Sequence, residues 1–156
     1  MLVDTGLRAT ELCELRLRNV DFNNRRLIVL GKGSEERIIP FSAVTSQAIW
    51  HYQATRSKDS ANDFLFVMPG GRPLDRVGLG KLILRIGERA GVTNAHPHRF
   101  RHTFSINFLQ NGDNAYALQM MLGHSTMEMV KRYLALAQAD VEAAHRQASP
   151  VANWRL

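Results

Sequence analysis

The stretch from residue 96 to residue 133 most constrains how this chain can fold, because its helix-starting and helix-ending residues divide it into three short helices. Proline suits the first turn of a helix, aspartate and threonine suit the N-cap, and glycine suits the residue after the last turn. The predicted helices are residues 97–111, begun by Pro97 and ended at Asn111-Gly112; residues 113–122, capped by Asp113 and ended by Gly123; and residues 126–137, capped by Thr126. Residues 140–147 predict a further helix, so the second part of the chain is expected to be mainly helical.

The first part of the chain combines helices with short strands. Arg26–Leu30 is an apolar run of strand length, the Gly31–Ser34 turn follows it, and Arg37–Phe41 returns as a second strand. This pattern predicts a β-hairpin with Lys32 at its tip. The other predicted elements are a short helix capped by Thr10, a turn at residues 20–24, a helix at 42–56, a polar loop at 57–63 and a strand at 64–67.

Residues 75–90 show the clearest amphipathic pattern. Apolar residues recur there at helical spacing. They are Leu79, Leu82, Ile83, Ile86 and Ala90. Lys81, Arg85 and Arg89 repeat every four residues along another face. This basic row is expected to be either a solvated surface or a set of contacts to nucleic-acid phosphates.

Composition favours an anionic partner and excludes several kinds of site. The 156 residues suffice for one domain with a core, and 20 Lys and Arg residues against 14 Asp and Glu residues give a net charge of +6. Nucleic acid is the first partner that such a charge suggests. The single cysteine, Cys13, excludes an intramolecular disulfide and a multi-cysteine metal site. No signal peptide opens the chain and no apolar run approaches the roughly 20 residues needed to span a bilayer, so we expect a cytoplasmic protein without a membrane partner.

Four residues of the second part have side chains suited to phosphate chemistry, although each also has an ordinary structural explanation. His98 and Arg101 are three residues apart and therefore share one face of a helix. His124 directly follows a helix end, where histidine often serves as a C-terminal cap. Tyr133 stands among apolar neighbours, as a core tyrosine does. Their order and spacing, taken with an arginine and a lysine in the first part of the chain, are more specific than any one of them.

This pattern resembles the catalytic domain of the tyrosine recombinase family, which includes phage integrases. The resemblance extends from residue 3 to about residue 137, and all six functional positions of the family are filled. The matching segments are Thr5-Gly-Leu-Arg8-Ala-Thr-Glu11-Leu, Lys32 in the hairpin turn, His98-Arg-Phe-Arg101-His-Thr103, Leu122-Gly-His124, and Tyr133 nine residues later. Arg99 departs from the commonest form of the family, in which an acidic residue follows the first histidine of this box.

The resemblance implies an α+β, mainly helical fold. In it a small antiparallel sheet, made by the hairpin near residues 26–41 and the strand near 64–67, packs against a helical core. The resemblance also implies that residues 1–156 form a single catalytic domain, truncated at its N-terminus and lacking the core-binding domain that clamps DNA. Residues 138–156 would be a C-terminal helix and tail, for which contact with a neighbouring protomer and packing on the same domain are equally consistent.

The activity implied by the resemblance is site-specific recombination, in which double-stranded DNA is cut and rejoined through a covalent 3′-phosphotyrosine without metal, cofactor or ATP. Forked, permanently charged guanidiniums suit the charge that grows on the phosphate oxygens. The resemblance implies that Arg8, Arg101 and His124 bind the phosphate and that Tyr133 is the nucleophile. It implies that His98 transfers a proton and that Lys32 protonates the leaving 5′ oxygen. Glu11 would orient Arg8 or a histidine. Thr103 and Arg132 are expected beside phosphates, and a homotetramer is expected on two duplexes.

Three other functions are open to the same residues. His96, His98 and His102 suggest a metal-dependent nuclease, although no carboxylate or cysteine accompanies them in the sequence. A DNA-binding fragment with little activity of its own is a second alternative, and an enzyme like type IB topoisomerases is a third. The compact arrangement of the boxes and the histidine at position 124 favour a recombinase over a topoisomerase.

Overall fold

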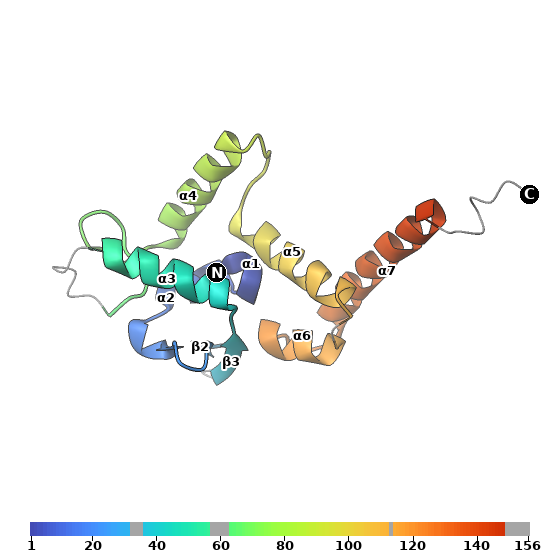
Figure 1. Cartoon of the computed structure of the whole chain (residues 1–156), viewed down its shortest axis with the longest axis horizontal. Coiled ribbons are helices and arrows are strands. Elements are labelled where there is room, and N and C mark those ends of the chain that lie inside the picture. The colour runs from blue at the N-terminus through green and yellow to red at the C-terminus, as the bar shows by residue number, and fades with distance from the viewer. Residues whose placement is uncertain (32–35, 57–62, 113, 149–156) are drawn as a thin grey trace, which may run out of the picture. The chain divides into compact units, whose positions relative to one another are not determined.

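The computed structural model of the chain describes residues 1–31, 36–56, 63–112 and 114–148 (Figure 1). The chain divides into two compact units, Met1–Phe104 and Ser105–Leu156, and helix α5 (Pro97–Gln110) contributes residues to both. The architecture is mainly helical with a small antiparallel sheet, which confirms the fold class expected from the sequence.

The sheet of the first unit has three strands in the order β1, β2, β3. They are β1 (Val20–Asp21), β2 (Arg26–Leu30) and β3 (Glu36–Pro40). The last two form the predicted antiparallel hairpin, in which Leu27 pairs with Ile39 and Val29 pairs with Arg37. Side chains alternate between the two faces of a strand, and the three apolar residues of these pairs all lie on the buried face.

The third strand of the sheet differs from the prediction. The segment 64–67 makes isolated bridges, to Arg16 and Pro73, outside the sheet. Its backbone is used by another part of the chain, because the Leu65 N–H donates to the carbonyl oxygen of Leu15 at 2.7 Å. The third strand is instead β1, at residues where a turn was predicted.

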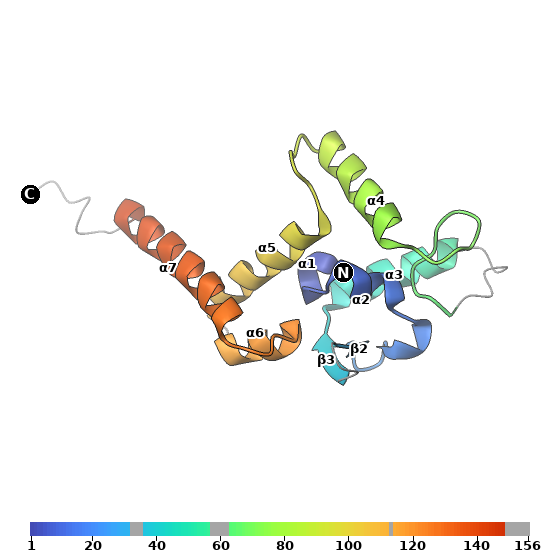
Figure 2. The ribbon, with the colours of Figure 1, turned by 180° about the vertical axis from the view of Figure 1, so that it is seen from behind.

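The first unit also contains several helices, and Figure 2 shows them from behind. They include α1 (Leu2–Thr5), α2 (Ala9–Glu14), the short 3₁₀ helix η1 (Leu17–Asn19), α3 (Ala43–Thr55) and α4 (Arg76–Arg89). α2 contacts α4. The carboxylate of Asp4 accepts the Ser42 N–H at 2.8 Å and so links α1 to the residue that caps α3.

The starts of α2 and α4 show two ways in which this sequence caps a helix. The Glu11 carboxylate accepts the backbone N–H of Arg8 at 2.8 Å and satisfies the start of α2 from within its first turn. α2 therefore begins before Thr10, and the prediction that Thr10 caps it is wrong. Asp75 caps α4, because its Oδ1 accepts the Gly78 N–H at 2.6 Å.

The apolar face predicted for α4 is only partly buried. Leu79 and Ile83 are each 4% exposed, whereas Leu82 and Ile86 are 43% and 44% exposed. The buried stripe turns instead toward Gly87, where an added Cβ would collide with the Cβ of Ala95. The missing side chain lets the segment after α4 pack directly against the helix.

The second unit contains the rest of α5 together with α6 (Ala115–Leu122) and α7 (Glu128–Ala148). In both views α6 lies beside the first turns of α7 (Figures 1 and 2). The Asn114 side chain caps α6 by accepting the Tyr116 N–H at 2.8 Å. The predicted cap, Asp113, lies outside the described residues. Gly123 ends α6 in the left-handed region, with a φ of 61°, as its position in the sequence predicted.

The last helix is longer than expected. The helices predicted separately over residues 126–137 and 140–147 form one continuous helix, α7. No glycine or proline interrupts residues 128–148, so nothing in the backbone requires a break between the two segments. Val130, Tyr133 and Ala137 lie on the buried side of this helix.

Candidate active site

A group of charged side chains at the start of α2 centres on Glu11, whose side chain is 7% exposed. Its Oε1 accepts a hydrogen bond from Nη1 of Arg8 at 2.8 Å. Its Oε2 accepts the backbone N–H of Arg8 and Nη2 of Arg37, also at 2.8 Å each. The side chains of Arg8 and Arg37 are 40% and 10% exposed. These three residues, Arg8, Glu11 and Arg37, form the Glu11 cluster.

The electrostatics of the cluster keep Glu11 charged. Burial by itself would raise the pKa of the Glu11 carboxyl. The hydrogen bond and charge of Arg37, with the backbone and side-chain bonds from Arg8, outweigh that effect and hold the pKa below its ordinary value. A carboxylate fixed in this way can in turn fix the guanidinium of Arg8.

Arg101 is anchored at the end of the preceding helix, α1. Arg101 is 2% exposed, and its Nη1 donates a hydrogen bond to the carbonyl oxygen of Gly6 at 2.7 Å. Gly6 has φ 62° and ψ 19°, the left-handed conformation that glycine adopts without steric cost. Because Gly6 is two residues before Arg8, the turn between α1 and α2 contains both the acceptor for Arg101 and Arg8 itself.

The other predicted site residues of the first unit lie on α5 or near the hairpin. His98 and Thr103 are exposed residues of α5, and His98 lies one turn before Arg101. Lys32 lies outside the described residues, in the connection between β2 and β3. The structure thus brings together Arg8, Glu11 and Gly6, the acceptor for Arg101, in one short segment.

The second unit positions His124 and Tyr133. His124 is half-buried after Gly123, where its N–H donates to the Gln119 carbonyl at 3.2 Å and its own carbonyl accepts Nε2 of Gln119 at 3.0 Å. Tyr133 is 7% exposed on α7, between Val130 and Ala137 on the buried side. The neighbouring Arg132 is exposed, as a phosphate contact would be.

Arg37 is the member of the Glu11 cluster that the sequence-based reasoning missed. The sequence places it first in the second predicted strand of the hairpin. A signal was present, because Arg37 lies two residues before the buried Ile39 and therefore points to the same face of β3. A cation on the buried face of a strand requires a partner.

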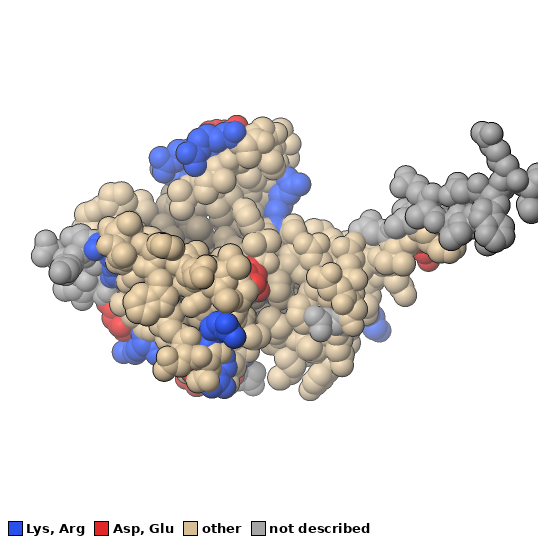
Figure 3. Space-filling model, in the orientation of Figure 1, with Lys and Arg blue, Asp and Glu red and all other residues tan. Residues whose placement is uncertain are grey.

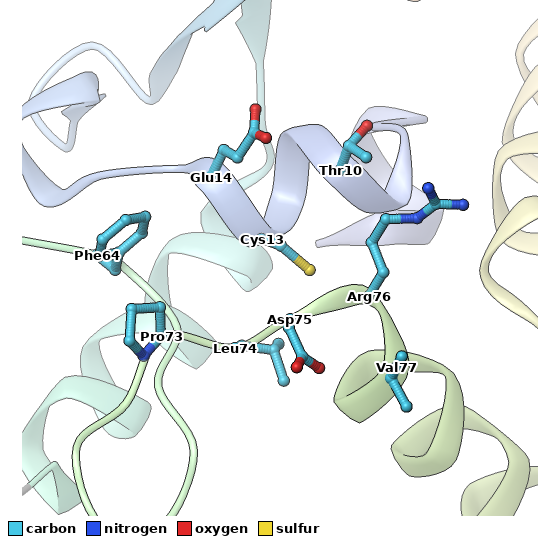
Figure 4. Close-up of a pocket in the computed structure, with 9 residues that line it drawn as sticks. All are labelled: Thr10, Cys13, Glu14, Phe64, Pro73, Leu74, Asp75, Arg76 and Val77. Carbon is cyan, nitrogen blue, oxygen red and sulfur yellow. The ribbon is translucent and has the colours of Figure 1, made fainter.

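A hollow of about 440 Å³ is lined in part by residues that neighbour Glu11 in the sequence, but by none of the three residues of the Glu11 cluster (Figure 4). Its lining comes from Thr10, Cys13 and Glu14 of α2, from Phe64, and from residues 73–77. Figure 4 shows the Cys13 sulfur pointing from α2 toward the segment that enters α4. Burial, with the nearby charges of Asp75 and Glu14, raises the pKa of the Cys13 thiol, which disfavours the reactive thiolate form.

The basic row predicted on α4 is exposed. Lys81, Arg85 and Arg89 are all exposed residues of this helix, and Figure 3 shows Lys and Arg side chains along its outer side. They lie on a different face from the buried Leu79 and Ile83. The row is therefore accessible to an anionic partner.

The described part of the chain provides no other obvious ligand site. Among the residues described, no group of three or more His, Cys, Asp or Glu side chains could hold a metal ion. His96, His98 and His102 are exposed side chains at the start of α5 and do not form such a group. No helix among the described residues is both long enough and apolar enough to cross a membrane.

Known proteins with similar sequences are recombinases. The model of the phage integrase family matches residues 1–140. Tyrosine recombinase XerC of Staphylococcus carnosus is 34% identical over 156 residues, which cover 98% of this chain and 53% of the relative. Tyrosine recombinase XerC of Corynebacterium efficiens is 34% identical over 151 residues, which cover 96% of this chain and 49% of the relative. The chain thus spans about half the length of the curated relatives it matches.

Solved structures give the same picture. XerA recombinase matches with a TM-score of 0.84 and 30% identity, over 96% of this chain and 56% of that one. The Tn1549 transposon integrase, in complex with a circular intermediate DNA, matches with a TM-score of 0.73 and 28% identity, over 91% of this chain and 56% of that one. The fold is therefore that of tyrosine recombinase catalytic domains.

Proposed function

The chain belongs to the phage integrase family, and we propose that it is the catalytic part of a site-specific recombinase that cuts and rejoins double-stranded DNA through a tyrosine. The relatives support this proposal, since they are tyrosine recombinases and one transposon integrase is bound to DNA. The cytoplasm is the proposed compartment. A homotetramer is the proposed assembly of the full-length protein on DNA.

The observation that carries this proposal is the anchoring of two arginines by one short segment. The carbonyl of Gly6 accepts a bond from Arg101, and the carboxylate of Glu11 accepts two from Arg8. Guanidiniums remain charged at any working pH and present forked donors that match phosphate oxygens. Donors that are fixed before the reaction stabilise a transition state without having to reorganise during it.

In the proposed reaction, Tyr133 supplies the nucleophile and leaves a covalent 3′-phosphotyrosine. Its phenolic oxygen forms a bond to phosphorus while the bond from phosphorus to the 5′ oxygen breaks, and the electron pair leaves with that oxygen. His98 accepts the phenol proton, because a phenol that keeps its proton is a weak nucleophile and needs a base. Lys32 returns a proton to the 5′ oxygen. Another DNA 5′ hydroxyl then reverses these steps, so no ATP is consumed.

The remaining proposed contacts steady the phosphate. Arg8 and Arg101 bind the non-bridging oxygens, on which charge accumulates, and His124 donates a further hydrogen bond. Thr103 and Arg132 are proposed as neighbouring phosphate contacts. The row on α4 formed by Lys81, Arg85 and Arg89 is proposed to bind DNA without reading its sequence.

Covalent capture of DNA tests this function. The 156-residue chain is mixed with nicked suicide duplexes of random sequence, from which the short 5′-hydroxyl fragment diffuses away after cleavage. We expect a protein–DNA band that survives denaturation with the wild type and is lost with Tyr133→Phe. Tyr116→Phe is the matched control, because Tyr116 is a 61% exposed tyrosine on α6.

The same assay separates the competing functions. A covalent band that persists in Tyr133→Phe refutes the nucleophile. Cleavage that chelator abolishes indicates a metal-dependent nuclease, whereas binding without any covalent band indicates a DNA-binding fragment. Relaxation of a supercoiled plasmid without strand exchange would favour a topoisomerase.

A further inference from the structure

Arg37 is a charged residue on the buried face of the hairpin. It pairs across the strands with Val29, which is 3% exposed, and it shares its face of β3 with Ile39, which is 0% exposed. Placing a guanidinium among such residues is costly unless a charged partner compensates for the lost water. The partner is the carboxylate of Glu11, 26 residues earlier in the chain.

Glu11 connects two arginines that differ in burial. Arg37 is 10% exposed and Glu11 is 7% exposed, so surrounding atoms hold both side chains. Arg8 is 40% exposed, so burial does much less to immobilise its guanidinium. The bond from Arg8 Nη1 to Glu11 Oε1 therefore transmits the order of the buried pair to a cation at the surface.

We propose that Arg37 is a positioning residue for the recombination reaction: it locks the Glu11 carboxylate in the orientation that holds Arg8 against the phosphate. This inference rests on the proposed function, in which Arg8 binds a non-bridging oxygen. Arg37 itself does not touch DNA in this arrangement. It acts through Glu11, as outer partners of metal ligands act through the ligand they orient.

The geometry explains why Arg8 alone cannot replace this lock. Oε2 of Glu11 accepts both the Arg37 guanidinium and the backbone N–H of Arg8. Without the guanidinium, a buried carboxylate keeps its burial cost and loses a charged donor, so its charged form becomes less favourable. A protonated or rotated Glu11 no longer presents Oε1 as a charged acceptor to Arg8.

This mechanism predicts a pH effect that simple loss of packing would not produce. The charged groups facing Glu11 are Arg8, from the start of its own helix, and Arg37, from β3. The pKa of Glu11 is lowered in the wild type, with Arg37 as the main source of that lowering against the effect of burial. Replacing Arg37 by glutamine should therefore raise the pKa of Glu11 and move the acid limb of the cleavage rate to higher pH.

The first experiment measures cleavage and binding separately in the full chain. The probe is a nicked suicide duplex captured by the wild type, and the variants are Arg37→Gln and Arg37→Lys. At saturating DNA we expect Arg37→Gln to slow covalent-complex formation by about 10- to 100-fold. DNA affinity should change by less than about threefold, because a single phosphate contact is weakened and none is removed outright. Arg37→Lys should recover part of the rate, since it restores the charge but not the fork.

The matched control is Arg26→Gln on the neighbouring strand. Arg26 is an exposed arginine whose guanidinium lies 3.6 Å from Asp21, so this substitution removes the same charge from the same hairpin. Circular dichroism verifies that each variant is folded. Should Arg37→Gln not fold, the decision rests on Arg37→Lys, which must then show a slower rate and a shifted acid limb. An Arg37 variant that is folded and cleaves like Arg26→Gln overturns the proposal.

A second measurement decides the proposal independently of cleavage. NMR follows the Glu11 carboxyl through a pH titration and the Nε–Hε signal of Arg8 in the wild type and in the variants without DNA. Positioning predicts a higher Glu11 pKa and a faster-exchanging Arg8 signal when Arg37 is replaced. If these signals are the same in the wild type and the Arg37 variants, the positioning role is overturned. If the signals differ but the wild-type chain forms no covalent complex with DNA, only the proposed function is refuted.

Discussion

Arg101 donates a 2.7 Å hydrogen bond from Nη1 to the carbonyl oxygen of Gly6, a residue 95 positions earlier in the chain. The bond joins α5 to the end of α1, and both residues are buried. Gly6 can direct its carbonyl there because its φ is 62°. The glycine of the Thr5-Gly-Leu-Arg8 segment therefore has a physical role in placing an arginine far from it in sequence.

Gly6→Ala should destabilise the chain. An alanine in the left-handed region costs about 1–2 kcal/mol, and relief of that strain would turn the carbonyl away from Arg101. Urea unfolding measures the change. Gly91→Ala is the matched control, because Gly91 has φ 68° and nothing lies within 4 Å of an added Cβ. A loss for Gly6→Ala no larger than that of the control would mean that the carbonyl contact adds nothing to stability.

Arg101→Lys should preserve the positive charge but remove the forked donor. We expect covalent-complex formation to slow by about 100-fold or more, because one phosphate oxygen loses a preorganised donor. Stability should fall by about 1–3 kcal/mol if the lysine leaves the Gly6 carbonyl buried without its partner. Arg99→Lys provides the comparison, since Arg99 is an exposed arginine of the same helix that also donates to a carbonyl, that of Thr93, at 2.7 Å. Equal effects of the two substitutions would contradict the role of Arg101.

Glu11→Gln should make the stability of the chain less dependent on pH in the acid range. The pKa of Glu11 is lower in the folded chain than its ordinary value, so its ionised form stabilises the fold above an unfolded-state pKa of about 4.3. That contribution is lost as the pH falls through the lower, folded-state pKa. Urea unfolding at several pH values tests this, with Glu14→Gln as the exposed control on the same helix. An unchanged pH slope in Glu11→Gln would show that the carboxylate gains nothing from its partners.

Local sequence signals predicted most of the elements that frame the site. Strand-length apolar runs around a glycine-rich turn located the hairpin, and Pro97 and Gly123 correctly marked a helix start and a helix end. Such signals act over a few residues and need no knowledge of tertiary contacts. The predictions were wrong where the structure of a segment depends on a hydrogen-bond partner that is distant in the sequence or lies inside the helix itself. The Leu15 carbonyl draws Leu65 away from the sheet, and Glu11 replaces Thr10 in capping α2.

The candidate site was predictable to the extent that it depends on motifs. Arg8 and Arg101 were selected from their segments, and the structure gives both of them buried partners. Neither the contact of Arg101 with Gly6 nor that of Arg37 with Glu11 follows from motif spacing, because each contact joins residues that are far apart in the chain. Only the alternation of side chains between the two faces of β3 indicated that Arg37 points inward, and this alternation did not identify Glu11 as its partner.

The basic row on α4 gives a prediction about salt. If Lys81, Arg85 and Arg89 bind phosphates, replacing all three by glutamine should weaken binding to every DNA sequence alike. Each lost contact should reduce the slope of log affinity against log salt by about 0.9, so the combined change should approach roughly 2–3. Fluorescence anisotropy with labelled duplexes at several salt concentrations measures it.

The control for this experiment must lose the same charge from another surface of the first unit. Arg18, Arg25 and Arg26 are exposed residues near the sheet, and their replacement by glutamine changes the net charge equally. A purely global charge effect would lower both slopes to the same extent and would leave the α4 row as an ordinary solvated surface. A larger fall for the α4 variant would identify phosphate contacts there, because counterions are released only where cations meet the DNA backbone.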